Sequence, residues 1–89
     1  MNIKECSEII CKHLIDSCYQ DEADDIRKLT YIILSNCTSE DEKTISINDL
    51  LSRCHPKWLG DYYIKDVTYK YWTDLITKFR YLLEKCAAK

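Results

Sequence analysis

The sequence has few of the residues that make tight turns, with one glycine and one proline among 89 residues. Sheets with tight turns need glycine at positive φ, so this scarcity favours helices with few connections. No run of eighteen apolar residues occurs, and Lys4 and Glu5 are charged. We therefore expect neither a membrane-spanning helix nor a secretory signal, and we expect an intracellular protein of the cytoplasm or nucleus. Residues 1–89 should form one small domain, because either half alone would bury too small a core.

The sequence also lacks the motifs of common enzymes and metal sites. One glycine cannot build a phosphate-binding loop, and no His-Glu-x-x-His, EF-hand or Cys-x-x-Cys spacing occurs. His13 and His55 are the two histidines; His55 directly follows Cys54, and His13 lies two residues after Cys11. A nucleophile needs a base within reach and a third group to orient that base, and no such set stands out. We therefore predict no catalytic residues, cofactor, metal or small-molecule substrate.

Six cysteines need an explanation: Cys6, Cys11, Cys18, Cys37, Cys54 and Cys86. Free thiols buried as small apolar groups are the favoured interpretation. A disulfide scaffold is a second, although such scaffolds are loop-rich and secreted. A metal site is the third, and the adjacent pair Cys54-His55 is poorly spaced for two ligands on one element.

Charge is unevenly distributed along the chain. Residues 1–52 hold five basic and eleven acidic residues, whereas residues 53–89 hold eight basic and four acidic residues. A basic half can meet an anionic partner. The alternative is that the two halves attract each other within the folded domain.

The clearest helix is predicted at residues 66–86, with Asp66 as its N-cap. Its large apolar residues recur with the three-and-four spacing of one helix face. They are Trp72, Leu75, Ile76, Phe79, Leu82, Leu83 and Cys86. The opposite face carries Lys70, Thr73, Asp74, Thr77, Tyr81 and Glu84.

Three further helices are predicted at about residues 3–19, 21–36 and 47–54. His13 falls on the apolar face of the first and is expected to be a hydrogen-bonded side chain at the edge of the core. Asp21 is the expected N-cap of the second, and Ser46 or Asn48 of the third. Residues 38–43 read as a polar loop, and residues 44–47 alternate like a short strand. The predicted fold is therefore all-α or mostly α, with about four helices.

The order of these elements resembles the core of winged helix-turn-helix domains. The parts that match are a helix at 24–36, a strand at 44–47, a helix at 48–53 and a last helix at 66–85. Tyr71-Trp72, followed by Leu75, Phe79 and Leu82, is similar to the recognition helix in the winged helix of RecQ-type helicases. The resemblance covers residues 24–86 and implies a DNA-binding regulator. A four-helix bundle without a strand fits the same pattern.

Nucleic-acid binding is one functional hypothesis, with the helix at 66–86 in a groove. Basic residues would contact phosphates and give salt-dependent affinity, and threonine or tyrosine would touch bases or sugars. The candidate residues are Lys57, Lys65, Lys70, Thr73, Thr77, Lys78, Arg80 and Tyr81. Against this hypothesis, Asp74 and Glu84 share the outward face, and only three arginines are present.

Protein binding is the second hypothesis and is placed slightly ahead. The chain has more large apolar residues than 89 residues can bury: Ile9, Ile15, Tyr19, Tyr31, Leu34, Trp58, Tyr62, Tyr63, Tyr69 and Tyr81. The predicted partner-binding residues are Ile9, Ile15, Tyr19, Trp58, Tyr62 and Tyr63. The predicted helix at residues 3–19 has apolar side chains around much of its circumference, and a homodimer is the simplest way to bury them. Abundant Ile, Lys, Tyr, Asp and Ser suggest an AT-biased genome, which a virus, a parasite or a low-GC microbe would fit. An adaptor, subunit or inhibitor of this size is a common format for a viral protein.

Overall fold

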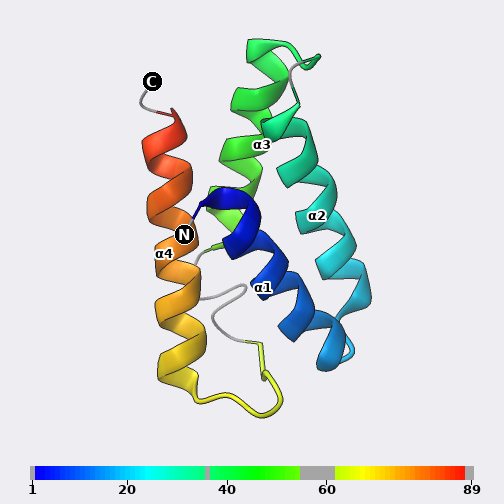
Figure 1. Ribbon diagram of the computed structural model, residues 1–89, viewed down its shortest axis with the longest axis vertical. Coiled ribbons are helices and arrows are strands. Elements are labelled where there is room, and N and C mark those ends of the chain that lie inside the picture. Colours follow the sequence, from blue (N-terminus) through cyan, green and yellow to red (C-terminus); the bar gives the residue numbers. More distant parts are fainter. Residues whose placement is uncertain (1, 36, 55–61, 88–89) are drawn as a thin grey trace.

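The computed structural model describes residues 2–35, 37–54 and 62–87, and of these it describes Ala87 by its backbone alone. Within these ranges the chain forms four α-helices and no strand. They are α1 (Ile3–Asp16), α2 (Gln20–Leu34), α3 (Glu40–Arg53) and α4 (Tyr69–Ala87). The helices run alternately up and down, and α4 packs on both α3 and α1, which closes a ring (Figure 1). This arrangement confirms the all-α prediction of about four helices.

The core lies inside this ring and is filled from all four helices. Trp72, Phe79 and Leu83 of α4 are almost fully buried, and Leu75 and Ile76 are buried beside them, as the periodicity predicted. Leu82 and Cys86 of the same stripe are partly buried against the core. The other helices contribute Cys6, Ile10, Cys11, Leu14, Ala23, Ile26, Ile33, Ile47 and Leu50.

Helix α4 begins at Tyr69, three residues later than predicted, and Asp66 is not its N-cap. Asp66 instead has a φ of 66°, in the left-handed region that aspartate tolerates better than most residues. Thr68 performs the capping, because its hydroxyl accepts a hydrogen bond of 3.0 Å from the amide of Tyr71. The predicted cap was therefore wrong, although the buried face of the helix was correct.

The first two helices differ from prediction only at their ends. Helix α1 ends at Asp16 rather than residue 19, and Cys18 follows it with a φ of 71°. Helix α2 begins at Gln20 and ends at Leu34, against the predicted 21–36. Asp21 lies in the first turn of α2 instead of capping it, and the N-cap residue Tyr19 makes no side-chain cap bond.

The largest correction concerns α3, which begins seven residues before the predicted helix. Residues 44–47 lie inside it, so the predicted strand there was wrong, as was the loop over residues 40–43. The Ser39 hydroxyl accepts a hydrogen bond of 3.2 Å from the amide of Glu42 and caps the helix. Ile47 and Leu50 are buried at helical spacing, whereas Ile45 is 68% exposed. Neither Ser46 nor Asn48 is therefore the N-cap.

The start of α3 at Glu40 predicts how two alanine substitutions change stability. Ser39→Ala is expected to lower the free energy of unfolding by about 1 kcal/mol, because it leaves an amide of the first turn of α3 without its acceptor. Asn48→Ala is expected to raise it by a few tenths of a kcal/mol (~0.5), because Asn48 is exposed inside the helix and alanine is the better helix former. Urea unfolding followed by circular dichroism measures both. A destabilising Asn48→Ala with a neutral Ser39→Ala would contradict this start of α3.

None of the helices in the described part of the chain is long and apolar enough to cross a membrane.

Candidate functional site

Four of the six predicted partner-binding residues pack against the core and are only partly accessible. Ile9 and Ile15 of α1 are partly buried against it. Tyr19 and Tyr62 are also partly buried and stack on each other, with ring centroids 4.6 Å apart. Tyr63 is 79% exposed. Trp58 lies outside the described residues. The structure therefore leaves Tyr63 as the most accessible of the predicted partner-binding residues that it describes.

The predicted nucleic-acid residues line the outward side of α4 and the segment before it. Six of them are exposed, namely Lys65, Lys70, Thr77, Lys78, Arg80 and Tyr81. Thr73 is half-buried, and its hydroxyl donates to the carbonyl of Tyr69 at 3.0 Å. Lys57 lies outside the described residues. Arg80 pairs with Glu84 at 3.1 Å, so the outward face of α4 carries mixed rather than uniformly positive charge.

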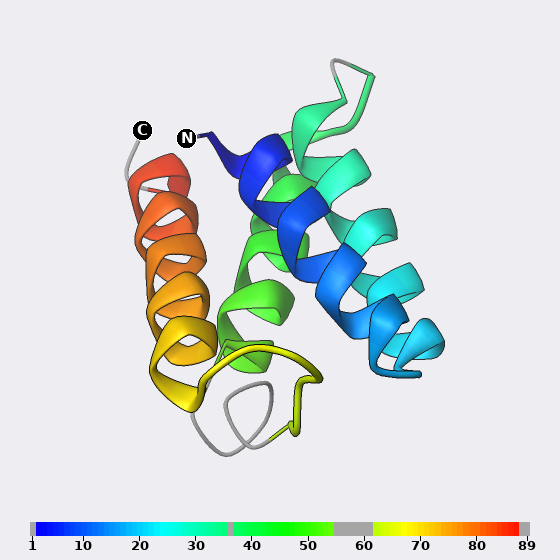
Figure 2. The same ribbon diagram turned by 60° about the horizontal axis from the view of Figure 1, so that its bottom comes forward.

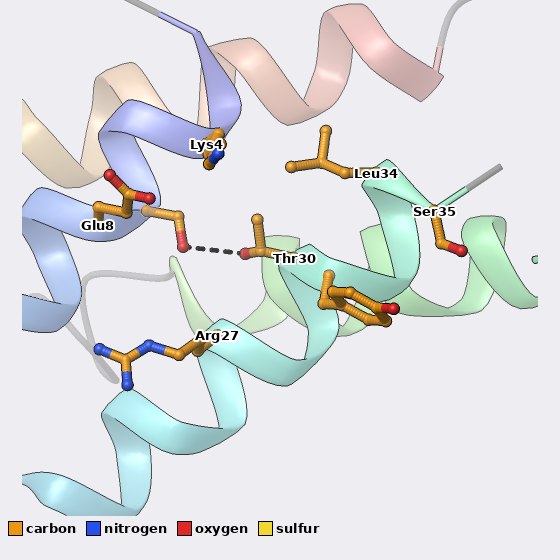
Figure 3. A pocket seen from close by; sticks show the side chains of 8 residues that line it. Lys4, Glu8, Arg27, Thr30, Leu34 and Ser35 are labelled. Atoms are coloured by element: carbon orange, nitrogen blue, oxygen red, sulfur yellow. Dashed lines mark hydrogen bonds between the residues drawn. The ribbon is translucent and has the colours of Figure 1, made fainter.

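A groove between α1 and α2 is the first half of the site that sequence reasoning missed (Figure 3). Its volume is about 310 Å³. Thr30 and Ser7 share a hydrogen bond of 3.0 Å at its floor, and Thr30 also donates to the carbonyl of Ile26 at 2.8 Å. Tyr31 and Leu34, which are 74% and 48% exposed, stand along α2 beside this floor. The full lining is Lys4, Ser7, Glu8, Arg27, Thr30, Tyr31, Leu34 and Ser35.

A second hollow of about 640 Å³ continues the first toward α4. It lies where the start of α1 comes beside the end of α4 (Figure 2). Its lining is Asn2, Ile3, Lys4, Leu34, Leu82, Lys85 and Cys86. Lys4 and Leu34 line both hollows, so the two hollows adjoin each other, and we term their joint surface the α1/α2/α4 groove.

The α1/α2/α4 groove has an apolar interior and a basic rim. Lys4, Arg27 and Lys85 line it, against a single acidic residue, Glu8. Among the described residues, none of these three basic side chains takes part in an ion pair. The chain as a whole has a net charge of −2, so the groove is a locally positive region of an acidic protein. Such a region attracts an acidic ligand.

His13 links α1 to α4 at the edge of the core. Its Nε2 lies 3.2 Å from the hydroxyl of Tyr71, within hydrogen-bond distance. Its ring also meets the ring of Trp72 edge to face, with centroids 6.3 Å apart. The prediction of a hydrogen-bonded histidine at the core edge is confirmed.

The six thiols are all free, and they fall into two groups. Burial raises the pKa of Cys6 and of Cys11, and it raises the pKa of Cys54 to about 12. A thiol with such a pKa is protonated at neutral pH and is a poor nucleophile. Cys18 and Cys37 are exposed, and Cys86 is half-buried in the groove. The prediction of buried free thiols therefore holds for three of the six. Groups of three or more side chains able to hold a metal ion are absent from the part of the chain that the structure describes.

This division predicts a pattern of chemical modification. Brief treatment of the folded protein with iodoacetamide should alkylate Cys18 and Cys37, because their thiols are exposed. Cys6, Cys11 and Cys54 should remain unmodified until the protein is unfolded in urea, because their thiols are buried and protonated. Peptide mass mapping before and after unfolding measures the extent at each position. Rapid modification of Cys54 in the folded protein would contradict this packing.

Comparison with known proteins adds no relative to these observations. No protein-family model, no curated protein and no solved structure matches this chain.

Proposed function

We propose that this protein is a non-enzymatic protein-interaction module that binds a segment of another polypeptide in its α1/α2/α4 groove. The single observation that carries this proposal is that two adjoining hollows extend over three helices, with Tyr31 and Leu34 exposed along them. Contiguous exposed apolar surface with a polar rim is typical of protein interfaces.

The chemistry of the groove favours a polypeptide over a small polar substrate. Ile3, Leu34 and Leu82 give it an apolar interior. The hydroxyls of Ser7 and Thr30 at its floor already bond to each other, so these buried polar groups need no hydrogen bond from a ligand. Its lining contains no histidine, and its one cysteine, Cys86, lies in the second hollow. The groove therefore offers shape and apolar contact rather than a nucleophile paired with a base.

Selection of binding peptides from a random displayed library tests this proposal. The selected peptides are expected to bind the protein and to lose binding at least tenfold (~1.4 kcal/mol) to the variant Leu34→Glu, because a carboxylate would be placed in the apolar interior. Thr77→Glu is the matched control on the outward side of α4 and should leave peptide binding unchanged. Failure to select any peptide, or equal loss in both variants, would refute the proposal.

Nucleic-acid binding through α4 is the second candidate function. The observation that favours it is the set of exposed basic side chains before and along α4, which are Lys65, Lys70, Lys78, Arg80 and Lys85. The winged-helix resemblance implies the same candidate, but the strand that it included at residues 44–47 is part of α3. If it is correct, fluorescence anisotropy with a labelled duplex should report binding that weakens steeply with salt, and Lys70→Ala with Lys78→Ala should weaken it further. Absence of salt-sensitive binding would remove this candidate and leave the groove proposal intact.

A further inference from the structure

The α1/α2/α4 groove lies at the same end of the bundle as an exposed acidic helix end. Helix α2 finishes at Leu34, inside the groove, and α3 starts at Glu40. The two helices join at the end of the bundle where α4 also finishes (Figure 1). A basic groove and an acidic helix start therefore lie close together at one end of the molecule.

The start of α3 complements the groove in charge. Its first turn holds Glu40, Asp41 and Glu42, all exposed. In the described ranges none of these carboxylates takes part in an ion pair. The groove presents Lys4, Arg27 and Lys85, which take part in no ion pair among the described residues, although Lys85 also lies over the ring of Tyr81 at 5.6 Å from its centroid. Opposite charges facing each other across an interface favour association and fix its orientation.

The same end of α3 also complements the groove in apolar surface. Ile45 is 68% exposed and lies one turn after Asp41, on the same side of the helix. Negative charge in a first helix turn is explained by the helix dipole alone. The dipole does not explain an exposed isoleucine beside that charge. An apolar groove with a basic rim accommodates both features.

We propose that the occupant of the α1/α2/α4 groove is the first half of α3 from a second copy of this chain. The inference rests on the proposed function, since it names the partner of the same groove. Because groove and acidic helix share one end of the molecule, a two-fold axis there places each groove against the other copy's α3. Both contacts form at once, and the assembly closes as an isologous homodimer.

The charges that define the dimer can be exchanged as a test. At about 100 µM, where association with micromolar Kd is nearly complete, sedimentation should give about twice the 10.6 kDa mass of one chain. The groove variant Lys4→Glu with Lys85→Glu should weaken self-association at least tenfold (~1.4 kcal/mol), because like charges would then face each other. The helix variant Asp41→Lys with Glu42→Lys should weaken it by a similar factor for the same reason. Over a dilution series, an equimolar mixture of the two variants should recover the wild-type affinity, because every contact is again between opposite charges.

Two controls separate this interface from a general effect of charge. Lys12→Glu with Lys28→Glu reverses two exposed basic residues outside the groove lining, and Asp74→Lys reverses an exposed acid on α4. Both should keep the wild-type mass, and circular dichroism should give the wild-type helix content for every variant. A monomeric wild-type protein, controls that weaken self-association equally, or a mixture that associates as weakly as either variant alone would overturn the dimer. Peptide selection on the groove would still succeed in those cases if the proposed function holds with a different partner.

Discussion

Replacing Phe79 with alanine is expected to lower the free energy of unfolding by about 3–5 kcal/mol. Phe79 is fully buried, and it lies at the middle of α4 among the side chains that fill the ring of helices. Its removal loses the transfer free energy of the ring and leaves a cavity that the rigid helices close only in part. Domains of this size have a total stability of about 5–15 kcal/mol, so the variant should be close to half-unfolded under mild denaturing conditions.

Urea unfolding followed by circular dichroism measures this loss. The control is Thr77→Ala, two residues earlier on the exposed side of α4, for which we expect a change within about 0.5 kcal/mol. A loss below about 1.5 kcal/mol for Phe79→Ala would mean that the site collapses easily or is not at the centre of the core.

Replacing Arg53 with methionine is expected to cost about 2–3 kcal/mol of stability. Arg53 donates to Glu22 at 2.8 Å and to Asp49 at 3.0 Å, and its side chain is 14% exposed. Burial lowers the pKa of Arg53, but its bonds to Glu22 and Asp49 raise it by more, so the pKa stands above its ordinary value. The variant leaves the Glu22 carboxylate, only 12% exposed, without its closest cation.

A surface pair provides the matched control for Arg53. Arg80→Met breaks an ion pair whose side chains are 50% and 53% exposed, and it should cost less than about 0.5 kcal/mol. Adding Glu22→Gln to Arg53→Met should restore about 1 kcal/mol of stability, because it removes the buried carboxylate charge that Arg53 no longer neutralises. Equal costs for the two arginines, measured by urea unfolding, would show that Arg53 is no more important than a surface ion pair.

Sequence correctly predicted the helices whose apolar residues follow helical spacing over several turns. In α4 the buried side chains from Trp72 to Leu83 recur at helical spacing over three turns. In α3 the signal is short, because Ser46, Ile47 and Leu50 are the buried residues inside the helix. Residues 44–47 alternate polar and apolar side chains, as a strand does, but in the helix Ile45 is exposed and Ile47 is buried. Ser39 is a better guide to the start of α3, because its hydroxyl and three following acids form a helix-start signal.

The groove could not be predicted from sequence, because three distant segments make it. Leu34, Ile3 and Leu82 come from the end of α2, the start of α1 and the last turns of α4. Only the up-and-down order of the helices brings these ends together. A usable signal was present, since Tyr31 and Leu34 stand out as surplus apolar residues on α2. Sequence does not show how α1 packs along α2, so it could not show that Tyr31 and Leu34 lie beside one groove.

The ring of helices has a consequence for how fast the chain folds. Three of its four helix pairs join neighbours in sequence, and two of them, α1 with α2 and α2 with α3, can form early across short connections. Only the pairing of α1 with α4 spans the molecule, through contacts such as His13 with Tyr71. Chains dominated by local pairings reach the native state in microseconds to milliseconds, and docking of α4 against α1 becomes the late, entropically costly event.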